Sequence, residues 1–234
     1  RPLDTHFNAF KKLDIKVKEK QNRIYHLQSA KKNKKTDITL EEASVTGTAN
    51  IIMGSILRNN IDTSIYNAAC EPYIQQLCKM LNKMGGKITG IGTNLLKIKG
   101  VKELNGCVHK ALPDMIEIGS WIGLAAMTKS SLTIKNASIN NLGMILDVFR
   151  KIGVKINIKK NDIIIKKQKS YQVETFMNGS VLTISDAPWP GFTPDLISIV
   201  LVLATQAKGS VLIHQKMFES RLFFVDKLID MGAK

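Results

Sequence analysis

A block of apolar and polar positions recurs along the chain at intervals of roughly 70 residues. In each copy a stretch with helical periodicity ends near a Gly or another turn residue, and a Lys and an alternating strand follow. The four copies begin near residues 10, 80, 149 and 228. Gly readily adopts the left-handed conformation that ends many helices, so it is expected just after each helical stretch. A repeat of this length predicts a small α/β module as the structural unit.

Each module is predicted to contain two short strands, an apolar helix rich in small residues, a further strand and an amphipathic helix. The apolar helices are expected at 49–57, 116–127 and 196–207, and the amphipathic helices at 72–84, 142–152 and 221–231. The paired strands are expected at 87–89 with 94–99 and at 154–159 with 162–167, and the single strands at 64–67, 131–135 and 210–214. Helices that are apolar on almost every side belong in a domain interior. The pattern therefore predicts helices inside and sheets outside.

A domain junction is predicted at Leu112-Pro113-Asp114, because this segment follows a complete module and its Pro interrupts the pattern before the next apolar helix. The two predicted domains span residues 1–112 and 113–234.

The composition, with 44% hydrophobic and 23% charged residues, is that of a globular protein. No window approaches the ~18 uninterrupted apolar residues of a membrane span, so no membrane partner is expected. The cysteines Cys70, Cys78 and Cys107 lack metal-ligand spacing, which favours reduced thiols in a cytoplasmic protein with no metal or other cofactor. A start at Arg1 and an end at Gly232-Ala233-Lys234 suggest a fragment of a longer chain.

The formal net charge of +15 is compatible with nucleic-acid binding. The lysines are spread over the whole chain, however, with one short cluster at 31–35, and no aromatic residues alternate with them to stack on bases. This distribution favours a solvated basic surface and no nucleic-acid partner. A basic cleft for a phosphorylated substrate fits the charge equally well.

The most rigid turn in the sequence, residues 185–195, places a carboxylate, Asp195, at the start of an apolar helical stretch. Its prolines restrict φ around Trp189, which the pattern suggests is exposed, and Gly191 frees the next turn. A carboxylate is favourable at the positive end of a helix. Asp195 is therefore either a helix cap or a catalytic group.

Three further segments carry candidate chemistry. Ser44 to Thr48 runs into a helix and is either an anion cradle or an ordinary Ser/Thr cap. The segment 1–6 combines Arg, Asp and His behind a Pro, and Arg suits phosphate recognition. Arg221 either meets an anionic substrate or pairs with Glu219.

Six segments, in order and over essentially the whole chain, resemble one family. They are RPLDTH (1–6), SVTGTANI (44–51), NAACEP (67–72), LPDMIE (112–117), PGFTPDL (190–196) and MFESR (217–221). The family is UDP-N-acetylglucosamine 1-carboxyvinyltransferase, the UDP-GlcNAc enolpyruvyl transferase of peptidoglycan synthesis. The resemblance implies the enolpyruvate-transferase fold, an inside-out α/β barrel of repeated modules with buried helices. It also implies that the chain holds the later part of the first domain and the first part of the second, so that both are incomplete.

The implied reaction transfers the enolpyruvyl group of phosphoenolpyruvate to the 3-hydroxyl of UDP-GlcNAc and releases phosphate. On this resemblance Asp195 takes the proton of that hydroxyl, and Arg1 neutralises charge beside the phosphates. The implied substrate contacts are the uridine segment Arg1, Pro2, Leu3, Asp4 and Thr5, the diphosphate loop Ser44, Val45 and Thr46, the GlcNAc contacts Asp195 and Met217, and also Arg221.

The sequence departs from the family pattern at Glu42, where a Lys is usual, at Thr46, where a Gly is usual, and at the inverted pair Thr193-Pro194. The family's mobile loop with its proton-donating acid precedes Arg1, so these 234 residues alone are expected to lack turnover. Two other functions stay open. One is a transferase of the same fold acting on shikimate-3-phosphate, and the other is an RNA-binding or RNA-end-processing relative.

Overall fold

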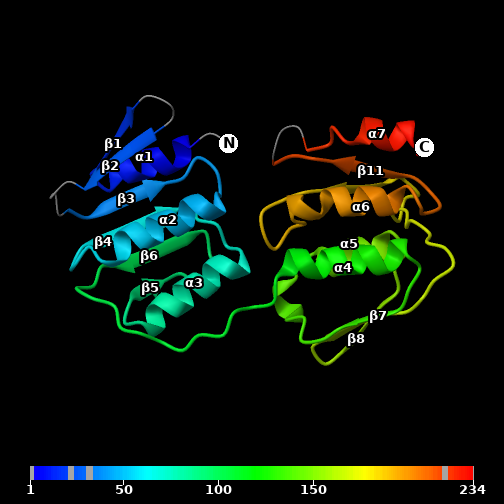
Figure 1. Cartoon of the computed structure of the whole chain (residues 1–234), viewed down its shortest axis with the longest axis horizontal. Helices are drawn as coiled ribbons and strands as arrows, with labels where there is room; N and C mark the ends of the chain where they lie inside the picture. The colour runs from blue at the N-terminus through cyan, green and yellow to red at the C-terminus, as the bar shows by residue number, and fades with distance from the viewer. Residues whose placement is uncertain (1–2, 21–23, 30–33, 218–220, 234) are drawn as a thin grey trace. The chain divides into compact units, whose positions relative to one another are not determined.

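The computed structural model describes residues 3–20, 24–29, 34–217 and 221–233 (Figure 1). Its contacts divide the chain into a first unit, residues 1–111, and a second unit, residues 112–234. The assignment of these units to particular enolpyruvate-transferase domains stays a prediction.

The first unit packs three helices on a mixed sheet (Figure 1). The sheet has the order β3-β4-β6-β5, in which β3 and β4 are parallel and the other pairs are antiparallel. Helix α2 contacts β4 and β6, and α3 contacts β5, while α1 packs on α2 beside the hairpin β1-β2. The elements are α1 (Asp4–Lys12), β1 (Ile15–Lys20), β2 (Ile24–Ser29), β3 (Thr36–Thr39), α2 (Val45–Ile56), β4 (Asp62–Tyr66), α3 (Pro72–Lys83), β5 (Lys87–Thr89) and β6 (Leu95–Lys99).

The second unit has two separate sheets. Helices α4 and α6 contact each other, and each of them contacts one of the two sheets. The antiparallel sheet β7-β9-β8 contacts α4, and the parallel pair β10-β11 contacts α6. The elements are α4 (Met115–Met127), β7 (Leu132–Ile134), η2 (Ile139–Asn141), α5 (Ile145–Lys151), β8 (Ile156–Lys159), β9 (Asp162–Ile165), β10 (Leu182–Ser185), η3 (Pro194–Leu196), α6 (Ile197–Ala204), β11 (Val211–His214) and α7 (Val225–Asp230).

Close packing of α4 against α6 depends on two glycines of α4. A Cβ built on Gly119 would lie 2.2 Å from Leu196 Cδ1, and one on Gly123 would lie 2.3 Å from Ile199 Cγ2. Leu196 is completely buried, so it has no free space into which to move. The two glycines therefore set how closely the start of α6 approaches α4.

The repeated helix ends predicted from the sequence are confirmed. The second residue after each of α1, α3, α5 and α7 has a positive φ, at Asp14 (58°), Gly85 (102°), Gly153 (100°) and Gly232 (94°). The first repeat has Asp14 at this position in place of Gly, and Asp adopts the left-handed conformation more readily than most residues. The same backbone device thus ends the helix in all four repeats.

Several predicted helices are shorter than expected. The helix predicted at 142–152 begins at Ile145, because Gly143 has φ 53° and Met144 donates its N–H to Pro190 O at 3.0 Å. The helix predicted at 196–207 follows a 3₁₀ turn and ends at Ala204. The helix predicted at 221–231 begins only at Val225, and before it the Arg221 N–H donates to the Gln215 side chain.

The expected burial of α4 on every side is wrong for part of its surface. Trp121 is 45% exposed and Leu124 is 50% exposed, whereas Ile118, Ile122 and Ala126 are buried in the core. The described elements cover one side of this helix, and the helix also carries apolar residues outside that side. Apolar composition alone therefore did not identify the buried face.

The three cysteines are free thiols in three different environments. Burial raises the pKa of the Cys78 thiol from 9.0 to about 11. Between these two pH values the unfolded chain binds fewer protons than the folded one, so stability falls as the pH rises. We expect the free energy of unfolding, measured in urea at about pH 8 and about pH 10, to decrease less in Cys78→Ala than in the native protein. The exposed Cys107→Ala is the matched control, and an equal decrease in both variants would contradict the expectation.

Among the described residues, no helix combines the length and apolar character needed to cross a membrane.

Candidate functional site

Asp195 lies in the 3₁₀ turn η3, directly before α6, and forms an ion pair with Arg221. The Arg221 Nη1 lies 2.6 Å from Asp195 Oδ1, and the two side chains are 28% and 48% exposed. Thr193 and Leu196 are the N-caps of η3 and α6, so Asp195 is not an N-cap residue and lies instead in the first turn of η3. The predicted alternative, a pair between Arg221 and Glu219, involves a residue outside the described ones. What the structure shows is an accessible carboxylate held from one side by a guanidinium.

The loop before Asp195 is closed by its own backbone. Ala187 N–H donates to Phe192 O at 2.9 Å, and Gly191 N–H donates to Pro188 O at 2.8 Å. Phe192 is almost fully buried and anchors the loop in the core. The expectation of an exposed Trp189 is wrong, because its ring packs against the core and its Nε1–H donates to Asn141 O at 3.2 Å. Asp195 is thus carried on a loop fixed at several points.

Met217, the other predicted sugar contact, follows strand β11 and is half-buried. Its N–H donates to Asp186 Oδ2 at 3.2 Å. Asp186 follows strand β10, which runs parallel to β11 in the register Ser185↔His214. The parallel pairing brings the segments after both strands, and hence Asp195, Met217 and Arg221, into one region of the second unit.

A second group of predicted residues lies in the first unit, around the start of α2. Ser44 is the N-cap of α2, and its Oγ accepts the Gly47 N–H at 3.1 Å. The cap reading of Ser44 is therefore correct, and whether the same turn also binds an anion stays a prediction. Val45 packs partly against the core, whereas Thr46 is exposed.

The segment Leu3 to Thr5 lies beside this turn. Leu3 is the N-cap of α1, Asp4 begins the helix, and Thr5 Cγ2 would lie 3.4 Å from a Cβ added to Gly47. Arg1 and Pro2 lie outside the described residues.

His6 joins the two segments of the first unit. Its Nε2 lies 3.3 Å from Thr46 Oγ1, and its Nδ1 lies 2.9 Å from Asn50 Nδ2. An amide nitrogen can only donate, so Nδ1 accepts, and Nε2 carries the proton that is donated to Thr46 Oγ1. The Thr46 hydroxyl hydrogen is then left to donate elsewhere.

Sequence reasoning missed the roles of His6 and Asp186. His6 was seen as part of a motif, but its partners lie 40 and 44 positions away. Asp186 directly follows an apolar strand, and this position alone does not indicate a buried carboxylate.

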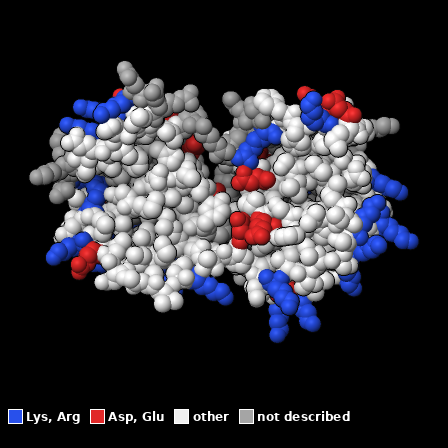
Figure 2. All heavy atoms as spheres, in the orientation of Figure 1, with Lys and Arg blue, Asp and Glu red and all other residues white. Residues whose placement is uncertain are grey.

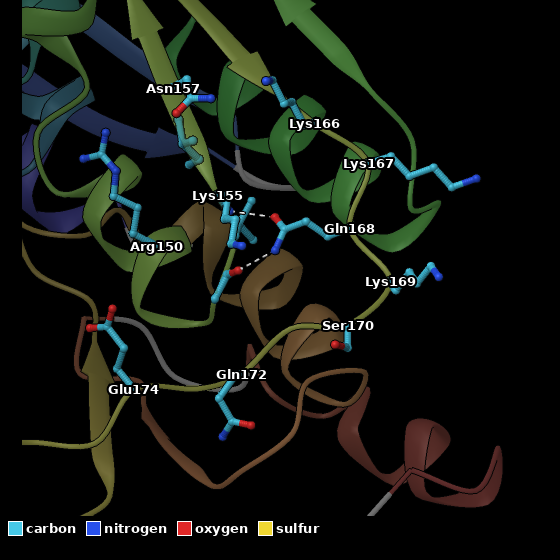
Figure 3. A pocket seen from close by; sticks show the side chains of 13 residues that line it. Arg150, Lys155, Asn157, Lys166, Lys167, Gln168, Lys169, Ser170, Gln172 and Glu174 are labelled. Carbon is cyan, nitrogen blue, oxygen red and sulfur yellow. Dashed lines mark hydrogen bonds between the residues drawn. The ribbon is translucent and has the colours of Figure 1, made fainter.

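A separate basic groove of about 1040 Å³ lies in the second unit, and none of its lining residues is a predicted site residue (Figure 3). Gln168 ties its two sides together by accepting from Lys155 N–H at 2.7 Å and donating to Gly153 O at 3.0 Å. Lys167 and Lys169 extend away from the groove rather than converging in it (Figure 3). On the face drawn in Figure 2, basic side chains are likewise scattered along the edges of each unit.

Within the described part of the chain, no group of three or more His, Cys, Asp or Glu residues is placed to hold a metal ion.

Comparison with known proteins places this arrangement in a family. Residues 1–234 match the family model described as EPSP synthase (3-phosphoshikimate 1-carboxyvinyltransferase). The chain is 60% identical to UDP-N-acetylglucosamine 1-carboxyvinyltransferase of Bacteroides fragilis and 58% identical to that of Porphyromonas gingivalis. In each case the match covers 100% of this chain and 54% of the relative, so the chain spans about half the length of these relatives.

A solved structure shows the same fold. The enolpyruvyl transferase NikO from Streptomyces tendae matches 99% of this chain and 55% of its own length, with a TM-score of 0.80 at 16% sequence identity. At that identity the likeness concerns the fold alone. The match of the family model to residues 1–234 shows that the chain belongs to the EPSP synthase (3-phosphoshikimate 1-carboxyvinyltransferase) family.

Proposed function

We propose that the protein transfers the enolpyruvyl group of phosphoenolpyruvate to the 3-hydroxyl of UDP-GlcNAc, with release of phosphate, as a step of peptidoglycan synthesis in the cytoplasm. The observation that carries the proposal is 60% identity, over all 234 residues, to a relative named for this reaction. In the reaction a C–O bond forms between the sugar oxygen and C2 of phosphoenolpyruvate. C3 takes up a proton in this step, and it loses one again when the bond from C2 to the phosphate oxygen breaks and phosphate leaves.

Asp195 is the proposed base for the sugar hydroxyl. A general base must come within hydrogen-bond reach of the proton that it removes, and it must be able to accept it. The Asp195 side chain is accessible to a substrate because it is 48% exposed, and its Oδ1 lies 2.6 Å from Arg221 Nη1. Arg221 holds the carboxylate in one orientation and is also a proposed substrate contact, as is Met217. The guanidinium and the start of α6 both attract negative charge at this point.

The group in the first unit is proposed to bind the nucleotide. The turn at Ser44, Val45 and Thr46 begins a helix of 12 residues, where backbone N–H groups and the helix dipole favour an anion. We assign this turn to the diphosphate. The segment from Arg1 to Thr5 is assigned to the uridine, with Arg1 neutralising phosphate charge during the reaction.

The competing acceptor is shikimate-3-phosphate, which the name of the family model suggests. The two are separated by measuring phosphate release by the full-length protein from phosphoenolpyruvate with each acceptor in turn. Turnover with UDP-GlcNAc and none with shikimate-3-phosphate is expected. Turnover with shikimate-3-phosphate alone would refute the proposed acceptor.

Replacement of Thr46 by Val tests the diphosphate assignment. If His6 donates to Thr46 Oγ1, the Thr46 hydroxyl hydrogen remains available to donate to a phosphate oxygen of the proposed substrate. Loss of a hydrogen bond to a charged group corresponds to roughly a tenfold rise in KM for UDP-GlcNAc, with kcat little changed. Thr39→Val, on an exposed position of β3, is the matched control and should leave KM unaltered. An unchanged KM in Thr46→Val would show that this hydroxyl does not contact the substrate.

A further inference from the structure

The carboxylate of Asp186 is buried and bonded to backbone. It is 1% exposed, the lowest exposure of any acidic residue in the described part of the chain. Its Oδ1 accepts the Lys216 N–H at 2.5 Å, and its Oδ2 accepts the Met217 N–H at 3.2 Å. A carboxylate withdrawn from water is costly unless hydrogen bonds compensate it. Here two charge-assisted bonds do so, and both fix the same short segment.

The backbone of Asp186 belongs to the loop that carries Asp195. Asp186 forms a bridge with Phe192, and the adjoining Ala187 N–H donates to Phe192 O at 2.9 Å. Phe192 is buried, and Asp195 follows it three positions later. The backbone of Asp186 is therefore fixed to the loop that presents the proposed base.

The side chain of Asp186 reaches the segment that leads to Arg221. Lys216 and Met217 are bonded to Asp186 through their N–H groups. Arg221 is bonded to the neighbouring Gln215, the first residue after β11, whose Oε1 accepts the Arg221 N–H at 3.2 Å. Arg221 in turn pairs with Asp195. Asp186 thus connects the two segments whose side chains meet in the ion pair.

We propose that Asp186 is a positioning residue, which sets the place of Arg221 and Met217 relative to Asp195 through the Lys216 and Met217 backbone amides. The inference rests on the proposed function and goes beyond it, because it assigns a role to a residue that is not proposed to contact the substrate. A neutral residue of the same shape would leave one of the two amide N–H groups facing an NH₂ group. Lys216 and Met217 would then shift together with the adjoining Gln215, whose side chain holds the Arg221 N–H.

The test is a double-mutant cycle on the full-length protein with Asp186→Asn and Arg221→Lys. Asp186→Asn is expected to lower kcat/KM for UDP-GlcNAc about tenfold, mostly through kcat, because small misplacements of catalytic groups are costly. If Asp186 acts through Arg221, the same change costs less than about threefold when Arg221→Lys is already present. A purely structural residue would give equal losses in both backgrounds, and that result would overturn the proposal.

Asp162→Asn is the matched control, since Asp162 Oδ1 also accepts a backbone N–H, that of Asn136 at 2.8 Å, in the same unit. Its kcat/KM should stay native. Should Asp186→Asn fail to fold, Gln215→Ala is tested instead, because it removes the hydrogen bond between Gln215 and the Arg221 N–H. Its loss of kcat/KM should likewise be smaller in the Arg221→Lys background. Absence of turnover by the native protein would overturn the proposed function itself, and with it the role of Asp186. Native turnover with additive losses would overturn only the role of Asp186.

Discussion

Replacement of Asp195 by Asn is expected to lower kcat for enolpyruvyl transfer by about a hundredfold to ten-thousandfold, the usual contribution of a general base. The amide keeps the size of the side chain but accepts a proton poorly. Binding of UDP-GlcNAc should persist, because the remaining substrate contacts are unchanged. Phosphate release and calorimetric binding measure the two effects separately on the full-length protein.

The second unit supplies a matched control for this variant. Asp147 also pairs with an arginine, Arg150, at 3.0 Å, and it is exposed on α5 away from the predicted site residues in the sequence. Asp147→Asn should keep native kcat, as expected for a surface ion pair of little energetic weight. If Asp195→Asn retained kcat within a few-fold of native, Asp195 would not be the base.

Replacement of Gly119 by Val is expected to destabilise the second unit by about 3 kcal/mol or more, at or above the upper end of the usual cost of overpacking. The first added carbon would already lie 2.2 Å from Leu196 Cδ1 and 2.8 Å from Cδ2. Leu196 is fully buried and directly follows Asp195, so any shift that relieves the clash also moves the proposed base. Urea unfolding followed by circular dichroism measures the loss.

Gly106→Val is the control for this change, because no atom lies within 4 Å of a Cβ added there. It should change the free energy of unfolding by less than about 0.5 kcal/mol. Equal stability of Gly119→Val and Gly106→Val would mean that α4 and α6 can separate without cost.

The sequence predicted those features of the fold that depend on residues near one another in the chain. The helix ends at Gly85, Gly153 and Gly232 were predictable because the left-handed conformation is a property of the residue itself. The helix start at Ile145 was not, because Gly143 and Met144 respond to Pro190, which is more than 40 positions away. Tertiary contacts decided that boundary.

The site divides in the same way. The position of Asp195 before an apolar helix followed from the Pro-rich turn and is as expected. Its pairing with Arg221 and the attachment of Met217 to Asp186 did not follow, since both depend on β10 and β11 lying side by side. The first-unit segments 44–48 and 1–6 were indicated by their residue types, and the resemblance added their assignment to the nucleotide. The bridging role of His6 required coordinates.

The parallel pairing of β10 and β11 also bears on redesign of the proposed acceptor site. Ser185 and His214, the last residues of β10 and β11, are paired with each other. The segments that follow the two strands therefore begin at the same edge of the sheet, independently of their sequences. Replacing such a segment by that of a homologue would leave the pairing of β10 and β11 unchanged. Exchanging the segments that follow β10 and β11 together is therefore the design that keeps this register.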